Sequence, residues 1–419
     1  MYPPSAESGG DIVMIETIRK VAGVIVREGK LLLVRQRGQN VFLSPGGKPE
    51  DGETPVQTLA RELREETGLL LVDAVKMGRF EGVSPFDDRA VLMDVYLTNV
   101  AGSPRPGHEI EELLWVAGDF ERYGIEVGSV FARGVIPRLV AEGLVDARSR
   151  ETRFLTAPEP GDSRVFVFDL DGTLVFHNRP LDKSIEASIH GLLARGDEVV
   201  FATARAPRGV AHVLPASLLD RPTLFCNGAM CRVGEREVFR RPLEPPTAAA
   251  ILDALCRSGA SFQLEYGDRF YLHGDTSQFG HMLEYGYEPP PGGLAAQPRD
   301  GILKIVTAAG DDASQSLELL QDVLAHIGVL VHDNGYIELV HKHVNKFSSF
   351  EMLMQHDERI YVVYVVFMGN DYNDFEMLVH ASESLIVGTS MDAVRHVCRS
   401  QTVENKTDEV AQAIQQYAK

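Results

Sequence analysis

A segment that begins at Gly47 combines acidic, basic and glycine residues at fixed intervals. Its defined positions are two glycines, four glutamates and an arginine: Gly47, Glu53, Arg61, Glu62, Glu65, Glu66 and Gly68. On a helix, Glu62, Glu65 and Glu66 would cluster on one face. Such like-charged neighbours destabilise a helix by roughly a few tenths of a kcal/mol per pair unless a cation lies among them. Carboxylate oxygens suit Mg²⁺ or Mn²⁺, so the spacing predicts a metal site rather than a solvated acidic face.

Two further acids directly follow an apolar, strand-like run. Asp169 and Asp171 come after residues 165–168, and open α/β sheets place their ligands at the carboxyl ends of strands. A carboxylate can attack an anionic phosphate only with a cation and hydrogen-bond donors beside it. Three later residues near strand ends could supply or support these groups: Thr203, Lys346 and Asp374. Singly they have ordinary explanations as a helix cap, a surface charge and an Asx-turn residue, but in this order they predict phosphoryl-transfer chemistry.

The first acidic cluster requires a helix with defined ends. Thr54 offers an N-cap and Gln57 the matching capping-box side chain, with a proline between them at the first helical position. Gly68 can end the helix. A buried stripe is expected from four apolar residues: Val56, Leu59, Ala60 and Leu63. Strand-like runs at residues 21–26, 31–34 and 90–97 frame this part of the chain.

The segment from residue 47 to 69 resembles the Nudix box at every defined position, a match expected by chance in about one such chain in 10⁵ to 10⁶. The resemblance implies hydrolysis of a phosphoanhydride by metal-activated water, with Mg²⁺ as the cofactor and Mn²⁺ as an alternative. It assigns the metals to Glu62, Glu65 and Glu66, catalysis to Glu65 and Arg61, which orients a glutamate, and phosphate contacts to Gly46 and Gly47.

Two weaker features bear on the substrate of this first domain. Pro85 lies sixteen residues past the box, as in some ADP-ribose-type Nudix enzymes, although a lone proline in such a segment is more often a plain loop residue. An extra catalytic acid can occupy the region that here contains Glu109, Glu111 and Glu112. A surface charge run is the alternative explanation.

The second set of residues resembles the motifs of the haloacid dehalogenase (HAD) superfamily, with Asp-Leu-Asp-Gly-Thr at 169–173 as motif one and residues 369–374 as motif four. The resemblance implies that Asp169 attacks phosphorus and that Asp171 transfers a proton to and from the leaving group. It assigns metal binding to Asp169, Asp171, Asn370, Asp371 and Asp374. It assigns phosphate binding to Thr203, Arg205, Lys346 and Asn227.

Motif four departs from the common family pattern, which begins Gly-Asp where this sequence has Gly369-Asn370. Two alternatives follow. Either the loop shifts so that Asp371 reaches the metal, or Asn370 ligates as a neutral oxygen and weakens Mg²⁺ binding.

The chain is long enough for two or more domains. A polar, Pro- and Gly-rich passage near residue 160 predicts a linker between a Nudix domain at 1–158 and the second domain. Buried strand-like runs at 165–168, 199–202 and 360–368 predict a doubly wound, Rossmann-like α/β core at 159–240 and 337–419. The insert at 241–336 resembles the α/β cap of Cof-type HAD phosphatases. The resemblance to Nudix proteins implies an α/β/α sandwich with a mixed sheet for the first domain.

Composition restricts the partners. The formal net charge of -19 argues against binding to nucleic acid polymers or anionic membranes, which depends on Lys and Arg. The absence of a signal-like or long apolar segment predicts a cytoplasmic protein. The four cysteines are too unevenly spaced for a disulfide framework or zinc site and are expected to be buried thiols: Cys226, Cys231, Cys256 and Cys398.

Two functional hypotheses remain from the sequence. The first is a bifunctional hydrolase for small nucleotide or phosphorylated substrates, in which Nudix cleavage yields a phosphomonoester that the HAD domain dephosphorylates through an aspartyl-phosphate. The second is an active Nudix enzyme with a HAD domain that senses phosphorylated ligand without turnover. The sequence does not determine the substrates, whether the two activities act in sequence, or the oligomeric state.

Overall fold

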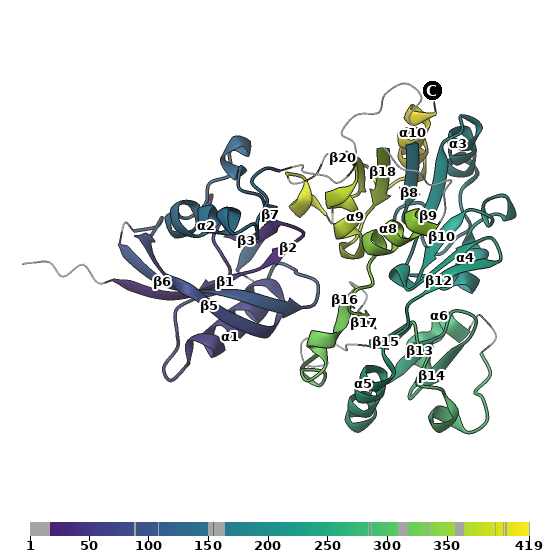
Figure 1. Ribbon diagram of the computed structural model, residues 1–419, viewed down its shortest axis with the longest axis horizontal. Coiled ribbons are helices and arrows are strands. Elements are labelled where there is room, and N and C mark those ends of the chain that lie inside the picture. The colour runs from purple at the N-terminus through teal and green to yellow at the C-terminus, as the bar shows by residue number, and fades with distance from the viewer. Residues whose placement is uncertain are drawn as a thin grey trace, which may run out of the picture.

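The computed structural model describes residues 17–87, 89–107, 109–149, 154, 164–283, 285, 287–308, 317–332, 335–356, 364–389, 391–396, 398 and 400–418. Figure 1 shows an N-terminal domain, coloured purple and blue, beside a C-terminal domain that comprises a core and a cap. In the described part of the chain, no helix has the length and apolar character needed to cross a membrane.

In its described residues, the N-terminal domain contains two sheets and two α-helices. Its elements are β1 (Ile18–Val24), β2 (Val26–Arg27), β3 (Lys30–Gln36), β4 (Gly46–Gly47), α1 (Pro55–Thr67), β5 (Leu70–Val83), β6 (Ala90–Ala101), β7 (Ile110–Val116) and α2 (Ile136–Ala141). The sheets have the orders β4-β1-β6-β5 and β2-β3-β7. Because β1 is parallel to β6 and antiparallel to β4, the first sheet is mixed, as predicted. The run expected at 21–26 is divided at Ile25, where the chain passes from one sheet to the other.

Helix α1 has the predicted ends. The Thr54 side chain accepts a hydrogen bond from the Gln57 amide, the Gln57 side chain completes the capping box, and Gly68 adopts the left-handed conformation (φ 67°). The prediction that Val56 is buried is wrong, because the first turn lies in solvent and Val56 is 45% exposed. The buried residues of α1 begin at Thr58 and include Glu66. Glu66 is therefore buried because it lies on the side of the helix that faces the core.

The core of the C-terminal domain is an eight-stranded sheet of order β12-β11-β10-β9-β8-β18-β19-β20. Its strands are β8 (Arg164–Phe168), β9 (Glu198–Ala202), β10 (Pro222–Phe225), β11 (Met230–Val233), β12 (Arg236–Arg240), β18 (Tyr364–Gly369), β19 (Glu383–Val387) and β20 (Ser400–Val403). Six neighbouring strands of this sheet, β10, β9, β8, β18, β19 and β20, are parallel to one another. At the edge next to β10 the sheet continues with β11, which is antiparallel to these strands, and then with β12, which is antiparallel to β11. The predicted doubly wound α/β class is confirmed.

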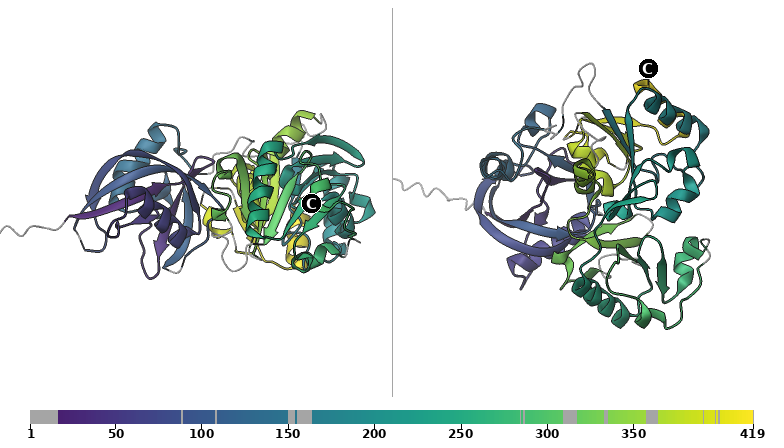
Figure 2. Two further views of the ribbon diagram at one scale, coloured as in Figure 1. Left: turned by 90° about the horizontal axis from the view of Figure 1, so that it is seen from below. Right: turned by 45° about the vertical axis from the view of Figure 1, so that its right-hand side comes forward.

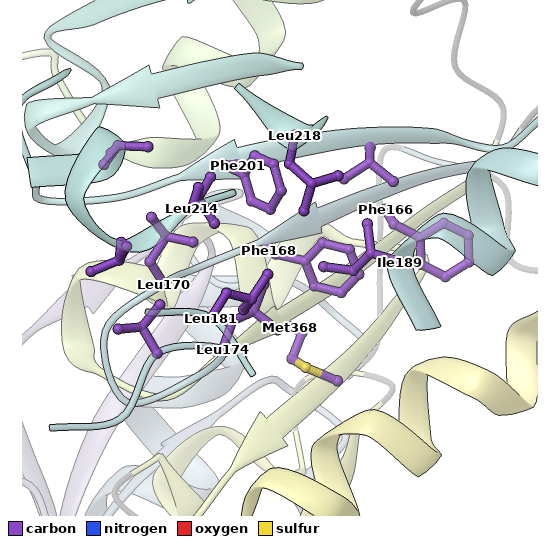
Figure 3. Close-up of a cluster of buried hydrophobic side chains, with 14 of the residues drawn as sticks. Phe166, Phe168, Leu170, Leu174, Leu181, Ile189, Phe201, Leu214, Leu218 and Met368 are labelled. Atoms are coloured by element: carbon purple, nitrogen blue, oxygen red, sulfur yellow. The ribbon is translucent and has the colours of Figure 1, made fainter. Parts of the chain in front are cut away.

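Helices cover both faces of this sheet. Because successive side chains of a strand point to opposite faces, each strand packs against helices on both sides. The helices are α3 (Lys183–Ala194), α4 (Pro207–Val213), α8 (Lys346–His356), α9 (Phe375–His380) and α10 (Thr407–Tyr417). Phe166 and Phe168 pack with residues of α3, α4 and α10, a cluster shown in Figure 3. Val165 and Val167 pack on the other face with residues of α8 and α9. Because helices bury both faces of the sheet, the side chains on both faces are apolar and the strands are continuous hydrophobic runs.

The cap is a separate antiparallel sheet of order β14-β13-β15-β17-β16, which lies below the core in the right-hand view of Figure 2. Its elements are α5 (Pro245–Ser258), β13 (Phe262–Glu265), β14 (Phe270–His273), α6 (Gly280–Leu283), β15 (Lys304–Ala308), β16 (Ile327–Val331) and β17 (Tyr336–His341). The predicted cap boundary at residue 336 is too early, because β17 pairs with both β15 and β16 and belongs to the cap sheet.

The predicted domain boundary at residues 158–159 lies outside the described residues. Before it in the chain, Asp146 still forms an ion pair with the buried Lys30 of the N-terminal domain, whereas Phe154 already packs against Phe347 and Phe350 of the C-terminal core. The expectation of buried thiols is correct for three cysteines but wrong for Cys256, which is exposed at the solvent side of α5.

Candidate active sites

Arg61 organises the acidic face of α1. Its guanidinium forms ion pairs with Glu53 (2.8 Å), Glu62 (2.9 Å) and Glu65 (3.2 Å). These contacts outweigh partial desolvation and raise the pKa of Arg61, so its charge is permanent. Arg61 thereby fixes two of the three predicted metal ligands, and Glu65, at the exposed side of the helix, turns toward it.

Glu66 lies deeper, against the short strand β4. Its carboxylate accepts a hydrogen bond of 2.8 Å from the Gly46 amide. Burial, reinforced by the charge of Glu62, outweighs that bond and raises the pKa of Glu66 to about 8. A Cβ at Gly47 would lie 1.9 Å from Oε1 of Glu62, so only glycine leaves room for that carboxylate. Thus the predicted glycines contact the predicted ligands.

The donor chemistry of this helix face fits a divalent cation. Oxygen donors are the ligands that Mg²⁺ prefers, and a nearby cation would favour the charged form of Glu66 that burial disfavours. Among the described residues, no three acidic, imidazole or thiol groups are already arranged as a complete metal site. Glu65 faces Arg61 instead, so metal binding would require the Arg61 contacts to be shared.

A cavity of about 170 Å³ opens beside Gly46. Its lining combines three cationic side chains, Lys20, Lys48 and Arg89, with aromatic side chains, Phe86 and Phe131, and includes Pro85. Of the three acids predicted further along, Glu111 and Glu112 are paired with Arg35. The negative charge of the third acid, Glu109, contributes to the raised pKa of Glu66.

In the C-terminal core, a buried lysine joins two aspartates. Lys346 Nζ lies 2.6 Å from Oδ1 of Asp169 and 2.6 Å from Oδ1 of Asp374, and neither Lys346 nor Asp374 is exposed to solvent. The other oxygen of Asp374 accepts hydrogen bonds from the amides of Asn370 (2.9 Å) and Asp371 (3.2 Å). Asp374 therefore holds the loop after β18 in place below Asp169.

Asn370 and Asp371, the two alternative ligands of motif four, make different contacts in the structure. The Asn370 side-chain amide lies 3.1 Å from Oδ2 of Asp169 and 2.9 Å from the main-chain oxygen of Asp171. The Asp371 carboxylate instead accepts from the Tyr372 amide and lies 3.8 Å from His332 of the cap. Asn370 is thus the residue next to the predicted nucleophile.

Burial also changes the pKa of the predicted nucleophile, Asp169. It raises the pKa of Asp169 to about 7, and the charge of Lys346 opposes this effect. A cation beside Asp169 would favour its ionised form further. The oxygens of Asp169 and the Asp171 main chain suit a hard divalent ion. Asn370 would have to turn its amide so that the oxygen faces the ion, and this neutral oxygen attracts a cation less than a carboxylate does.

The predicted phosphate-binding residues differ in their positions. Arg205 forms a two-bond ion pair with Asp171, at 2.8 and 2.5 Å, and its own amide donates to the Thr203 hydroxyl at 3.1 Å. Asn227 is different, because its amide donates to Glu338 of the cap (2.6 Å) and accepts from Asn373 (3.0 Å). Asn227 therefore links the core to the cap.

Family models match both domains of the chain. The haloacid dehalogenase-like hydrolase model matches residues 166–414, and the NUDIX domain model matches residues 17–119. An 8-oxo-dGTP diphosphatase of Haemophilus influenzae is 34% identical over 116 residues, which are 26% of this chain and 81% of that protein. The chain belongs to both families. With a domain of each, it is a bifunctional hydrolase.

Two further similarities concern the HAD domain. An HMP-PP phosphatase of Cronobacter sakazakii is 26% identical over 234 residues, 55% of this chain and 85% of that protein. The crystal structure of a haloacid dehalogenase-like hydrolase from Bacteroides thetaiotaomicron matches with a TM-score of 0.52 at 18% identity, covering 61% of this chain and all of that one. The structural similarity supports the fold.

The HAD cavity contains charged residues that the sequence analysis missed. It has a volume of about 420 Å³ and lies between the core, with Asp169, Asp171 and Arg205, and the cap. In the cap, Lys304 forms a buried ion pair with Glu338 at 2.5 Å and donates to the Ala204 carbonyl at 2.9 Å. A signal existed, since Lys304 interrupts an apolar run, and a buried charge requires a partner.

Proposed function

We propose that the HAD domain hydrolyses phosphomonoesters through an aspartyl-phosphate. The observation that carries this proposal is Asp169, held by the buried Lys346 at the carboxyl ends of parallel strands, in a cavity lined by the core and the cap. Asp169 attacks phosphorus, and the bond from phosphorus to the leaving oxygen breaks as Asp171 protonates that oxygen. Water then attacks phosphorus, its proton passes to Asp171, and the bond to Asp169 breaks to release phosphate.

Other residues of the HAD site support these steps. Lys346 offsets the negative charge that accumulates when a carboxylate approaches phosphate. Arg205 and Thr203 supply donors for phosphate oxygens, and the ion pair of Arg205 with Asp171 holds the proton carrier at the cavity. Asp169, Asn370 and the main-chain oxygen of Asp171 would hold Mg²⁺, which would screen the phosphate charge when bound.

For the Nudix domain we propose hydrolysis of a phosphoanhydride in a nucleotide-type substrate. Glu62, Glu65 and Glu66 would hold Mg²⁺, which would lower the pKa of a bound water. The cationic lining of the adjacent cavity suits phosphates, and its aromatic side chains suit a planar base. The similarity to an 8-oxo-dGTP diphosphatase supports this substrate class.

The two activities are chemically compatible in sequence. Cleavage of a diphosphate linkage produces phosphomonoesters, the substrate class that an aspartyl nucleophile hydrolyses. We therefore propose that one product of the Nudix domain is a substrate of the HAD domain. If the wild-type chain dephosphorylates no monoester that Nudix cleavage releases, the proposal of sequential action is wrong. The two separate activities would not be contradicted by that result.

The test uses the full chain and a panel of nucleoside triphosphates, nucleoside-diphosphate-linked compounds and phosphomonoesters with Mg²⁺. Asp169→Asn should reduce monoester turnover by at least about a thousandfold, because it removes the nucleophile, and should leave diphosphate cleavage intact. Glu66→Gln should produce the opposite pattern. Chelation with EDTA should abolish both activities.

Arg79→Ala is the matched control, because it breaks only an exposed ion pair with Asp94 on the Nudix sheet and should keep both activities. Wild-type protein that binds phosphorylated ligands but turns over no monoester would contradict the phosphatase proposal. That outcome would favour the sensor alternative, with Asn370 as its structural basis.

A further inference from the structure

The hairpin between β2 and β3 of the Nudix domain contacts the HAD core. Arg27 Nε and Nη2 lie 2.8 and 2.7 Å from Oε1 of Glu376, whose side chain is 4% exposed. The next residue, Glu28, lies 2.5 Å from His380. Glu376 and His380 both belong to α9, and Figure 1 shows β2 on the side of the Nudix domain that faces this helix.

Aromatic side chains extend the same contact. The Arg27 guanidinium lies over the rings of Tyr372 (5.0 Å) and Phe375 (5.4 Å), which stack on each other. Trp115 of β7, the only tryptophan of the chain, packs on Phe375 at 4.8 Å. The Nudix domain therefore contacts residues on both sides of Asp374.

The HAD residues that contact Arg27 and Trp115 lie only one or two positions along the chain from a residue of the phosphatase centre. Asp374 lies between Tyr372 and Phe375 in the chain and receives both Lys346 and the Asn370 amide. On the other side, His380 stacks on Phe347, which directly follows Lys346. The hairpin thus contacts residues that lie close in the chain to Asp374, and through His380 and Phe347 it is linked to the neighbour of Lys346.

We propose that Arg27 of the Nudix domain is a positioning residue of the HAD phosphatase site, acting through Glu376 and the two aromatic rings on Asp374. The inference rests on the proposed phosphatase function. Without Arg27, Glu376 would be a buried carboxylate without its cation, and the first turn of α9 would have to move to hydrate it. A shift of that turn displaces Asp374, and through Lys346 it displaces Asp169.

A general docking role for Arg27 is the competing explanation, and another contact between the domains separates the two. Arg395 forms an ion pair with Glu112 at 2.8 Å, and this pair is partly exposed and includes no residue bonded to Asp374. Arg395→Ala therefore weakens domain contact without touching the turn that holds Asp374. It is the matched control for Arg27→Ala.

The experiment measures kcat and KM for a monoester turned over by the full chain, with diphosphate hydrolysis as an internal reference. Arg27→Ala should lower the phosphatase kcat on the order of ten- to a hundredfold, as loss of a supporting contact typically does, with KM within about twofold. Arg27→Lys should recover part of kcat, because it keeps the charge but not the planar stack. Arg395→Ala should match the wild type, and Trp115 fluorescence reports whether the domains remain docked.

An unchanged kcat in Arg27→Ala, or equal losses in Arg27→Ala and Arg395→Ala, would overturn the proposal. If Arg27→Ala does not fold, the same comparison is made with Arg27→Lys, for which an unchanged kcat is again decisive. If the wild type turns over no monoester, the phosphatase function itself fails. The positioning role of Arg27, which rests on that function, fails with it.

Discussion

Gly46 and Gly47 are adjacent, and the structure requires glycine at each of them for a different reason. A Cβ at Gly46 would lie 2.2 Å from the Val21 carbonyl oxygen, and its φ of 145° also favours glycine. A Cβ at Gly47 would meet only the end of the Glu62 side chain, which can rotate away. The first glycine is therefore required by the backbone and the second by the candidate site.

Substituting each glycine by alanine should separate stability from activity. Gly46→Ala should destabilise the protein by more than about 1 kcal/mol, because alanine is strained at that φ and clashes with main chain. Gly47→Ala should keep the melting temperature but lower Nudix turnover up to about a hundredfold, because it displaces the Glu62 carboxylate. Thermal unfolding and diphosphate hydrolysis measure the two effects, and a normal rate in Gly47→Ala would contradict a role for Glu62.

At the scale of elements, α1 shows how local sequence positions a site. The capping box of Thr54 and Gln57 fixes where the helix begins, and Gly68 fixes where it ends. Between these ends, the helical repeat determines that Glu62 and Glu66 face β4 while Glu65 remains at the exposed side. The glutamates therefore depend on the helix ends for their register.

Removing the N-cap should test the contribution of the helix end. Thr54→Ala should destabilise the Nudix domain by about 1 kcal/mol, since it leaves helix amides without a partner. Thr54→Ser retains the hydroxyl and should be close to wild type. The measurement is the melting temperature of the full chain, expected to fall by about 2–4 °C for Thr54→Ala. Equal melting temperatures would show that tertiary packing alone fixes this end.

At the scale of the whole molecule, the Nudix domain contacts the cap as well as the core. Arg105 donates to the Val331 carbonyl of the cap at 2.8 Å, and its own amide donates to Thr67 at the end of α1. Val331 precedes His332, which lies 3.8 Å from Asp371 of the core and 3.7 Å from Glu338 of the cap. The cap is thus held between the two other parts of the chain.

The His332 contact predicts a pH-dependent stability. Burial opposes its charged form, but the acids Asp371 and Glu338 outweigh burial and raise the pKa of His332 to about 9. Because the folded pKa lies above the unfolded value near 6.5, the stabilisation is complete below pH 6.5 and lost as pH rises through 9. The loss should be on the order of 2–3 kcal/mol. Unfolding curves from pH 6 to 10 should show it, and His332→Gln should remove that part of the pH dependence.

The sequence by itself determined the features that depend on local spacing. The glutamates of α1 could be predicted because helix ends and helical periodicity are encoded within a dozen residues. Asp169 and Asp171 could be predicted because an apolar run identifies the strand whose carboxyl end they follow. The mixed first sheet and the doubly wound second domain followed from the resemblances and from the same apolar runs.

The tertiary structure decided the features that join residues distant in the chain. Only packing shows that the Asn370 side chain contacts Asp169, that Asp371 contacts Tyr372 and His332, and that Arg205 pairs with Asp171. The roles of Lys304 and Arg27 likewise depend on partners supplied by other elements, since the fate of a buried charge is set by what the fold brings next to it. For the same reason Val56, apolar in sequence, is exposed in a first turn that has nothing to pack against.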